Sequence, residues 1–240
     1  MSLSKNQLKL IKSLSQKKYR VKTQLFIVEG SKGVAEFLNS NFELEQLFCV
    51  DDSSYKSYEK VQQISENELN KISSLSNPNN VLALFKIPSE NRPENKGLIL
   101  ALDEINDPGN LGAIIRLCDW FGITSLICST NTVDCYNTKV VQASMGSLKR
   151  VNVFYTDLHE YLSNCKLPIY GAMLEGENVH KVTFPKNAVL IMGNEANGIC
   201  DTIIQKLTHK ITIPRFGNLK QTESLNVATA TAILLSEFRR

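Results

Sequence analysis

The chain has 240 residues, of which 42% are hydrophobic, and its formal net charge is +3 at neutral pH. This length fits either one large α/β domain or a small domain joined to a medium one, and two domains is our interpretation. No apolar run reaches roughly 18 residues, and the N-terminus lacks the apolar segment of a signal peptide, which argues against membrane and secreted proteins. We expect a soluble, cytoplasmic protein.

Cysteine and histidine give no sign of a metal site. The six cysteines are scattered without a C-x-x-C pair, and most lie in apolar stretches, where we expect reduced, structural thiols. His159, His180 and His209 each stand alone, with no second ligand type at metal spacing. The sequence therefore predicts no metal.

The N-terminal residues 1–32 are strongly basic, with eight lysines and arginines against the single acid Glu29. Such a cluster suits phosphate and makes RNA a candidate partner. A solvated helix face of a lysine-rich protein explains the same charges, and the cluster alone does not separate the two. The candidate RNA contacts are Lys17, Lys18, Arg20 and Lys22.

The first part of the chain is predicted to be a small α/β domain over 1–88. Leu8, Ile11 and Leu14 have helical spacing. Further along, apolar runs predict strands at 25–28, 47–50 and 81–85, and amphipathic stretches predict helices at 31–39 and 66–74. The following segment, from Pro88 to Gly97, is polar and contains two prolines, so 89–97 is the predicted linker.

Strands and helices alternate in the remainder, 98–240. This order predicts a mostly parallel sheet covered on both faces, which binds ligands at the carboxyl ends of its strands. The predicted strands are 97–103, 124–128, 151–154, 168–173, 188–192 and 209–213, and the predicted helices are 110–121, 138–145, 158–165, 200–207 and 225–238.

The first of three polar strings is Asp107-Pro-Gly-Asn110-Leu-Gly112-Ala-Ile-Ile-Arg116. Its start is a turn signal, and we expect Asn110 to cap the helix that follows. Arg116 on that helix is either a plain surface arginine or a group placed to grip a phosphate.

The second string, Gly193-Asn-Glu195-Ala-Asn-Gly198, follows a fully apolar strand. Its glycines allow close approach of a ligand to the main chain, and Glu195 offers an acceptor for hydroxyl or amino groups. No Walker loop and no G-x-G-x-x-G follows a strand, which argues against a Rossmann site. An ordinary turn remains the alternative.

The third string is Ser224-Leu-Asn226, which follows Ile213-Pro214 after a polar stretch. Ser224 is the expected N-cap of the last helix, and Asn226 is expected to be buried and to need hydrogen-bond partners. An asparagine that only secures the neighbouring loop is the alternative.

The three strings, in this order, resemble the SpoU (TrmH-like) branch of the SPOUT superfamily of S-adenosylmethionine-dependent RNA methyltransferases. The N-terminal part is similar to the small RNA-binding domain of that family, of the ribosomal L-thirty-e fold, through Gln16-Lys-Lys-Tyr-Arg20 and Leu25-Phe-Ile-Val-Glu-Gly30. Two departures stand out: the stretch 217–222 looks about three residues longer than usual, and Pro78-Asn-Asn80 replaces a Pro-Gln-Gly.

The resemblance implies a parallel sheet with a deep trefoil knot, a homodimer with the last helix at its interface, and S-adenosylmethionine bound among the knot loops. The residues implied to hold S-adenosylmethionine are Met173, Leu174, Gly193, Asn194, Gly198, Ile213, Pro214 and Leu225. The implied reaction is methyl transfer to a ribose 2′-oxygen, in ribosomal RNA rather than transfer RNA.

A neutral hydroxyl is a poor nucleophile, so the site must orient it and help to remove its proton. The family places Arg116 nearest the chemistry. A guanidinium stays protonated, so we expect it to grip the adjacent phosphate and stabilise the developing alkoxide, with Asn110, Glu195, Ser224 and Asn226 as positioning groups. The alternatives are a transfer RNA 2′-O-methyltransferase, a non-catalytic RNA-binding or ribosome-assembly factor on the same scaffold, and an enzyme acting on a phosphorylated metabolite.

Overall fold

The computed structural model describes residues 2–217 and 224–240, and the chain divides into two compact units. The first unit comprises residues 1–89 and 134–149, and the second comprises 90–133 and 150–240. The segment 134–149, predicted to belong to the C-terminal domain, thus packs with the N-terminal residues. The extra residues of the stretch 217–222 fall almost wholly outside the described range.

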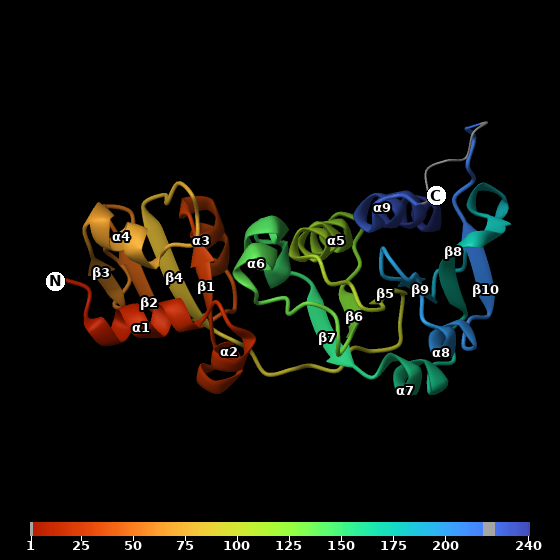
Figure 1. The fold of residues 1–240 in the computed structure, drawn as a ribbon, viewed down its shortest axis with the longest axis horizontal. Helices are drawn as coiled ribbons and strands as arrows, with labels where there is room; N and C mark the ends of the chain where they lie inside the picture. The colour runs from red at the N-terminus through yellow and green to blue at the C-terminus, as the bar shows by residue number, and fades with distance from the viewer. Residues whose placement is uncertain (1, 218–223) are drawn as a thin grey trace. The chain divides into compact units, whose positions relative to one another are not determined.

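The first unit is built on a four-stranded sheet of order β1-β4-β2-β3, in which only the β2–β3 pair is parallel (Figure 1). Its helices α1 and α4 each begin with a capping box, in which a serine and the side chain three residues later bond reciprocally to the main chain. The elements are α1 (Lys5–Ser13), α2 (Lys17–Thr23), β1 (Leu25–Glu29), α3 (Ser31–Leu38), β2 (Leu44–Cys49), β3 (Val61–Gln63), α4 (Glu66–Ile72), β4 (Val81–Lys86), α6 (Thr138–Ser144) and the 3-10 turn η1 (Ser147–Lys149).

Each face of this sheet has its own apolar core. On one face, Ile11 and Leu14 of the N-terminal helix and Leu69 and Ile72 of α4 pack on the strands. On the other, Phe26 of β1 is in ring contact with phenylalanines of α3 and β4 and with Tyr136, which precedes α6. The segment 134–149 therefore covers part of the first unit's sheet.

The second unit is a six-stranded, fully parallel sheet of order β10-β8-β9-β5-β6-β7. Figure 1 shows α5 and α9 on one face of the sheet and α7 and α8 on the other. The elements are β5 (Leu98–Leu102), α5 (Pro108–Trp120), β6 (Ser125–Ser129), β7 (Asn152–Thr156), α7 (Leu158–Ser163), β8 (Ile169–Asn178), η2 (Val179–Lys181), β9 (Ala188–Met192), α8 (Asp201–Ile204), β10 (His209–Thr212) and α9 (Val227–Arg239).

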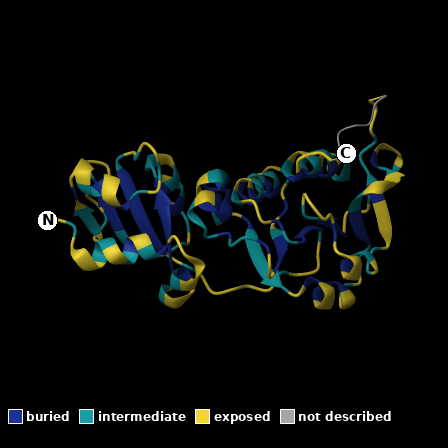
Figure 2. Cartoon of the chain, viewed as in Figure 1, coloured by how far each residue is buried: buried dark blue, intermediate teal, exposed yellow. Residues whose placement is uncertain are grey.

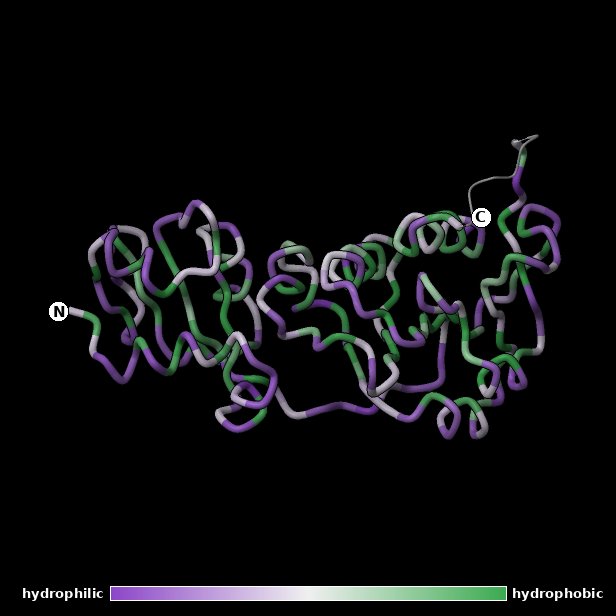
Figure 3. Tube along the Cα trace, viewed as in Figure 1, coloured by the Kyte–Doolittle hydropathy of each residue, from purple (hydrophilic) through white to green (hydrophobic). Residues whose placement is uncertain are grey.

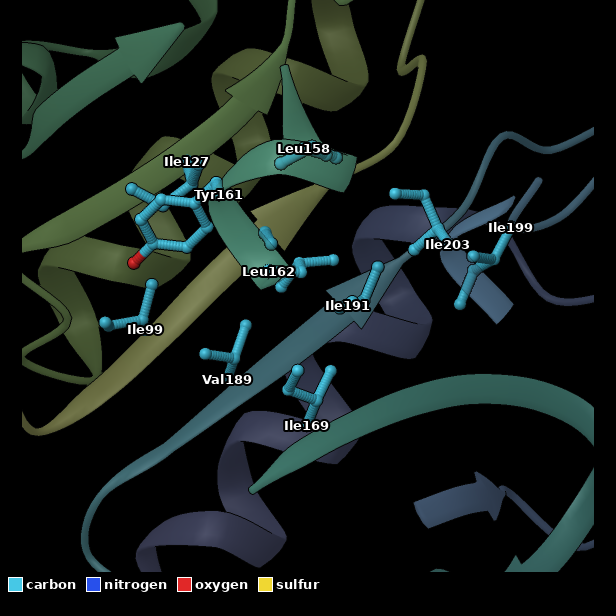
Figure 4. Packing of buried hydrophobic residues seen from close by; sticks show 11 residues of the cluster. Ile99, Ile127, Leu158, Tyr161, Leu162, Ile169, Val189, Ile191, Ile199 and Ile203 are labelled. Carbon is cyan, nitrogen blue, oxygen red and sulfur yellow. The ribbon is translucent and has the colours of Figure 1, made fainter. Parts of the chain in front are cut away.

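The central strands β5 and β9 are buried along their whole length, as their unbroken apolar sequences predict (Figure 2). Figure 4 shows the core on the α7–α8 face, where Ile99 and Ile191 of the strands meet Leu162 of α7 and Ile203 of α8. The stretch between β4 and β5 is mainly hydrophilic (Figure 3), as the predicted linker requires.

Candidate functional site

The first string starts α5, but with a different cap from the one predicted. The carboxylate of Asp107 accepts a hydrogen bond from the Asn110 N–H at 2.8 Å, and Pro108 occupies the first helical position. Proline suits that position because its missing N–H would have no partner there. The prediction that Asn110 caps the helix is therefore wrong, and its side chain is available for other bonds.

The third string starts α9, and here too the cap differs. Asn226 is the N-cap, and its Oδ1 accepts hydrogen bonds from the N–H groups of Ala228 and Thr229 at 3.0 and 3.2 Å. Asn226 is exposed, not buried as predicted, and Ser224 lies two residues before this N-cap instead of capping the helix itself. Asparagine and serine are comparable caps, so the sequence did not separate them.

The second string is a tight turn that closes on itself. Asn194 and Gly198 exchange two main-chain hydrogen bonds, and the Asn194 Oδ1 accepts one from the Ala196 N–H at 2.8 Å. Gly198 has a φ of +70°, which favours glycine. A Cβ at Gly193 would overlap main-chain atoms of Gly198, so both glycines are needed for this turn.

Two hydrogen bonds join the three strings. Asn110 Nδ2 donates to Glu195 Oε1 at 2.5 Å, and Asn226 Nδ2 donates to Asn110 Oδ1 at 2.9 Å. The partners lie 85 and 116 residues apart in the sequence. Because the strings follow strands β5, β9 and β10, they meet at the carboxyl ends of the parallel strands, where such a sheet is expected to bind its ligands.

A cavity of about 1310 Å³ opens beside this cluster, within the second unit. Apolar side chains such as Ile211 and Leu234 and the main chain of the turn 193–198 form much of its wall. Glu195 and Ser224 also line it. All eight residues predicted to hold a cofactor are part of the lining: Met173, Leu174, Gly193, Asn194, Gly198, Ile213, Pro214 and Leu225.

Arg116 is not among the residues that line this cavity. It lies on the exposed side of α5, one turn before Trp120, which is 84% exposed. The family resemblance implied that Arg116 lies nearest the chemistry, but within one chain, as far as the described residues go, Arg116 does not line this cavity.

The basic N-terminal residues divide into two groups. Lys17, Lys18 and Lys22 are exposed, as an RNA contact requires. Arg20 is only 2% exposed: its Nε and Nη2 donate to Asp134 Oδ2 at 2.8 and 2.5 Å, and its Nη1 donates to the Leu14 carbonyl at 2.7 Å. The prediction that Arg20 contacts RNA is wrong, because its guanidinium is already engaged inside the first unit.

Two residues at the end of β5 were missed by the sequence reasoning. Asp103 Oδ2 accepts a hydrogen bond from the Cys200 N–H at 2.8 Å, and the Glu104 carbonyl accepts one from Asn194 Nδ2 at 2.7 Å. Glu104 thus holds Asn194 within the turn 193–198, and Asp103 holds the main chain at Cys200, two residues after the turn. Two acids directly after a fully apolar strand are a signal that could have identified them.

The described residues contain no group of three His, Cys, Asp or Glu side chains arranged to hold a metal ion. Within the same ranges, no helix is both long and apolar enough to cross a bilayer.

Two family models match the chain. The SpoU rRNA methylase family matches residues 97–236, and the MRM3-like substrate binding domain matches residues 5–83. The first match contains all three strings of the site. The second contains the exposed basic residues of α2.

Relatives match over nearly the full length. A 23S rRNA (guanosine(2553)-2′-O)-methyltransferase, RlmP of Bacillus subtilis, is 30% identical over 95% of this chain and 94% of its own. A putative RNA methyltransferase of the TrmH family from Porphyromonas gingivalis is 37% identical, with a TM-score of 0.91 over 99% of this chain and 98% of its own. An AdoMet-bound rRNA methyltransferase from Sinorhizobium meliloti is 28% identical, with a TM-score of 0.88 over 100% of this chain and 97% of its own. The family model that covers residues 97–236 and the full-length relatives together show that the chain belongs to the SpoU family of RNA methyltransferases.

Proposed function

We propose that this protein transfers a methyl group from S-adenosylmethionine to the 2′-hydroxyl of a ribose in ribosomal RNA. The observation that carries the proposal is the hydrogen-bonded chain Glu195–Asn110–Asn226 at the cavity. It joins polar groups from three loops at the carboxyl ends of parallel strands, where such sheets bind their ligands.

The cavity suits S-adenosylmethionine in size and in chemistry. Its volume of about 1310 Å³ exceeds what a ligand of that size needs, which leaves room for a nucleotide as well. Apolar side chains such as Ile213 and Leu225 would hold the adenine, and main-chain groups of the turn 193–198 would bind the polar parts. S-adenosylmethionine supplies, when bound, an electrophilic methyl group on a positively charged sulfur.

The polar cluster would orient the ribose. Glu195 Oε1 is engaged by Asn110, and no bond to Glu195 Oε2 is seen among the described residues. Oε2 can therefore accept a hydrogen bond from the reacting hydroxyl and hold its oxygen toward the methyl donor. Asn226, with its Oδ1 committed to the start of α9, fixes Asn110 in the orientation that serves Glu195.

Arg116 would act in the cavity of a second copy of the chain. Helices α5 and α9 lie side by side, joined near their starts by Asn226 and Asn110 and near their ends by Arg239, which donates to the Phe121 and Gly122 carbonyls. The exposed side of α5 carries Arg116 and Trp120. A homodimer through this face would bring each Arg116 toward the partner's cavity, where it grips the phosphate and stabilises the developing alkoxide.

Mixed dimers test this arrangement. If Arg116 acts across the interface, mixing the inactive R116A and E195A variants restores one intact site per heterodimer, and about a quarter of wild-type activity returns after random exchange. If Arg116 acts within its own chain, both sites of every heterodimer stay defective and no activity returns.

The finer features of the fold are also part of the proposal. Strand β10 lies at the edge of the sheet while α9 packs beside α5, a placement that supports a trefoil knot in this part of the chain. Helices on both faces of the β1-β4-β2-β3 sheet support the ribosomal L-thirty-e fold for the first unit. For the domain limits, we propose 1–88 for RNA binding, 89–97 for the linker and 98–240 for methyl transfer. Within the last range, residues 134–149 pack with the RNA-binding domain.

Ribosomal RNA is favoured over transfer RNA by two observations. The relative that acts on 23S rRNA aligns with 95% of the chain, and a substrate-binding domain model matches residues 5–83. Lys17, Lys18 and Lys22 are the proposed RNA contacts, and the cytoplasm is the proposed location.

The experiment is to map 2′-O-methyl groups in the RNA of cells with and without this gene. The proposal is supported if the cells without the gene lack the methyl group at one ribosomal RNA position, and if the wild-type gene restores it while the R116A gene does not. A methyl group missing from a transfer RNA position instead identifies transfer RNA as the substrate. An unchanged map in both RNA classes overturns the enzymatic function and leaves the non-catalytic RNA-binding factor.

A further inference from the structure

Glu104 has an unusual main-chain conformation next to the cavity. It follows the buried strand β5 and Asp103, and its φ is +57°. Residues other than glycine adopt this left-handed region at an energetic cost, and such residues persist where their surroundings fix them. What surrounds Glu104 therefore indicates what the conformation serves.

Two contacts fix Glu104 from the side of β6. Its N–H donates to Ser129 Oγ at 2.9 Å, and Asn131 Nδ2 donates to its carboxylate at 2.7 Å. Ser129 is buried and is itself hydrogen-bonded to the hydroxyl of Thr132 at 3.0 Å. Main chain and side chain of Glu104 are thus both anchored to the loop after β6.

The remaining polar group of Glu104, its carbonyl, faces the cavity turn. It accepts the hydrogen bond from Asn194 Nδ2 at 2.7 Å, while the Oδ1 of the same side chain accepts from the N–H groups of Ala196 and Asn197. The Asn194 side chain therefore holds the main chain of the turn through its Oδ1, and the Glu104 carbonyl fixes the orientation of that side chain through its Nδ2. Glu195 lies between Asn194 and Ala196 in this turn, and its carboxylate accepts the hydrogen bond from Asn110.

We propose that Glu104 is a positioning residue for methyl transfer: its left-handed main chain aims the carbonyl at Asn194 and so sets the place of Glu195 in the cavity. This inference rests on the proposed function. A right-handed or extended conformation at residue 104 would redirect the chain at this point and release Asn194. The carboxylate bond to Asn131 explains why a glutamate can hold a conformation that favours glycine.

Three variants of Glu104 separate the main chain from the side chain. Valine is β-branched and strongly disfavours a positive φ, glycine adopts it freely, and glutamine keeps the length and an acceptor oxygen. We expect E104V to bind S-adenosylmethionine on the order of tenfold more weakly, or to turn over on the order of tenfold more slowly, because tenfold corresponds to about 1.4 kcal/mol. E104Q and E104G should stay within about threefold of wild type.

The readouts are S-adenosylmethionine affinity by calorimetry, kcat and KM for methyl transfer, and RNA affinity as the matched control. A loss in E104V that spares RNA affinity and is absent from E104G supports the inference. Equal activity of E104V and wild type overturns it, as does an E104G variant as impaired as E104V. A joint loss of RNA and S-adenosylmethionine affinity in E104V also overturns it, because that pattern reports general unfolding. A wild-type protein that binds no S-adenosylmethionine would refute the proposed function itself.

Discussion

Replacing Arg20 by methionine should destabilise the first unit strongly. The side chain is almost fully buried, and its three hydrogen bonds join α2 to Asp134 and to the Leu14 carbonyl. Asp134 is itself only 13% exposed. R20M would leave this carboxylate without its cation and the Leu14 carbonyl without a donor.

The expected loss in the free energy of unfolding is about 3–5 kcal/mol, the range for breaking a buried ion pair by removing one partner. The cost arises because a buried charge is left uncompensated. Removing both partners in R20M/D134L should therefore recover the part of the loss that comes from the uncompensated charge, since apolar replacement of a buried pair is often close to neutral. The hydrogen bonds from Arg20 to the Leu14 carbonyl and from the Tyr136 N–H to Asp134 Oδ1 remain lost in this double variant.

Hydrogen exchange of the main-chain amides of β1 and β4 measures this loss in the first unit, and the amides of β9 in the second unit are the control. We expect faster exchange in β1 and β4 for R20M, and exchange between that of R20M and that of the wild type for the double variant. A loss below about 1 kcal/mol in R20M, typical of a surface pair, would refute the reasoning, as would a double variant no more stable than R20M.

Three further outcomes are expected. Replacing Lys17 and Lys18 by alanine should weaken RNA binding and lower the salt dependence by about two units of slope, measured by titration at several salt concentrations; an unchanged slope would count against the basic surface of α2. Burial raises the pKa of the Cys118 thiol, so a thiol reagent at neutral pH should label the exposed Cys200 and spare Cys118, as peptide mass spectrometry can show. Hydrogen bonds from Ser65 and from the Leu3 N–H lower the pKa of Glu68. The ionised carboxylate therefore stabilises the fold above the ordinary glutamate pKa, and this stabilisation is lost as the pH falls through the lowered pKa. The stability of E68Q should depend less steeply on pH over that range in acid unfolding, and identical profiles for E68Q and wild type would contradict this.

The alternation of apolar runs made most of the second unit predictable. Strands such as β5 and β9 consist only of apolar residues, and their positions agree with those predicted to within a residue or two. Helix α8 covers only Asp201–Ile204 of the predicted 200–207, and β3 was missed because Val-Gln-Gln carries no apolar pattern. Short elements of this kind depend on their neighbours more than on their own sequence.

Long-range partners explain the remaining differences. Whether Arg20 faces RNA or the interior depends on Asp134, which lies 114 residues away. The docking of 134–149 on the first unit likewise depends on the fit between Tyr136 and Phe26. At the site, the strings contained Asn110, Glu195 and Asn226, which are hydrogen-bonded to one another, but they also contained Arg116, which does not line the cavity of its own chain. The cap at each helix start depended on a choice between side chains of similar propensity.

Transfer of a labelled methyl group tests the central claim most directly. Purified protein, S-adenosylmethionine labelled in its methyl group and ribosomal RNA lacking the modification are incubated, and the RNA is digested to nucleosides. We expect the label in a single 2′-O-methyl nucleoside, at a rate that R116A lowers by on the order of 100-fold or more. Label on a base, no label at all, or an R116A variant within about threefold of wild type would contradict the account.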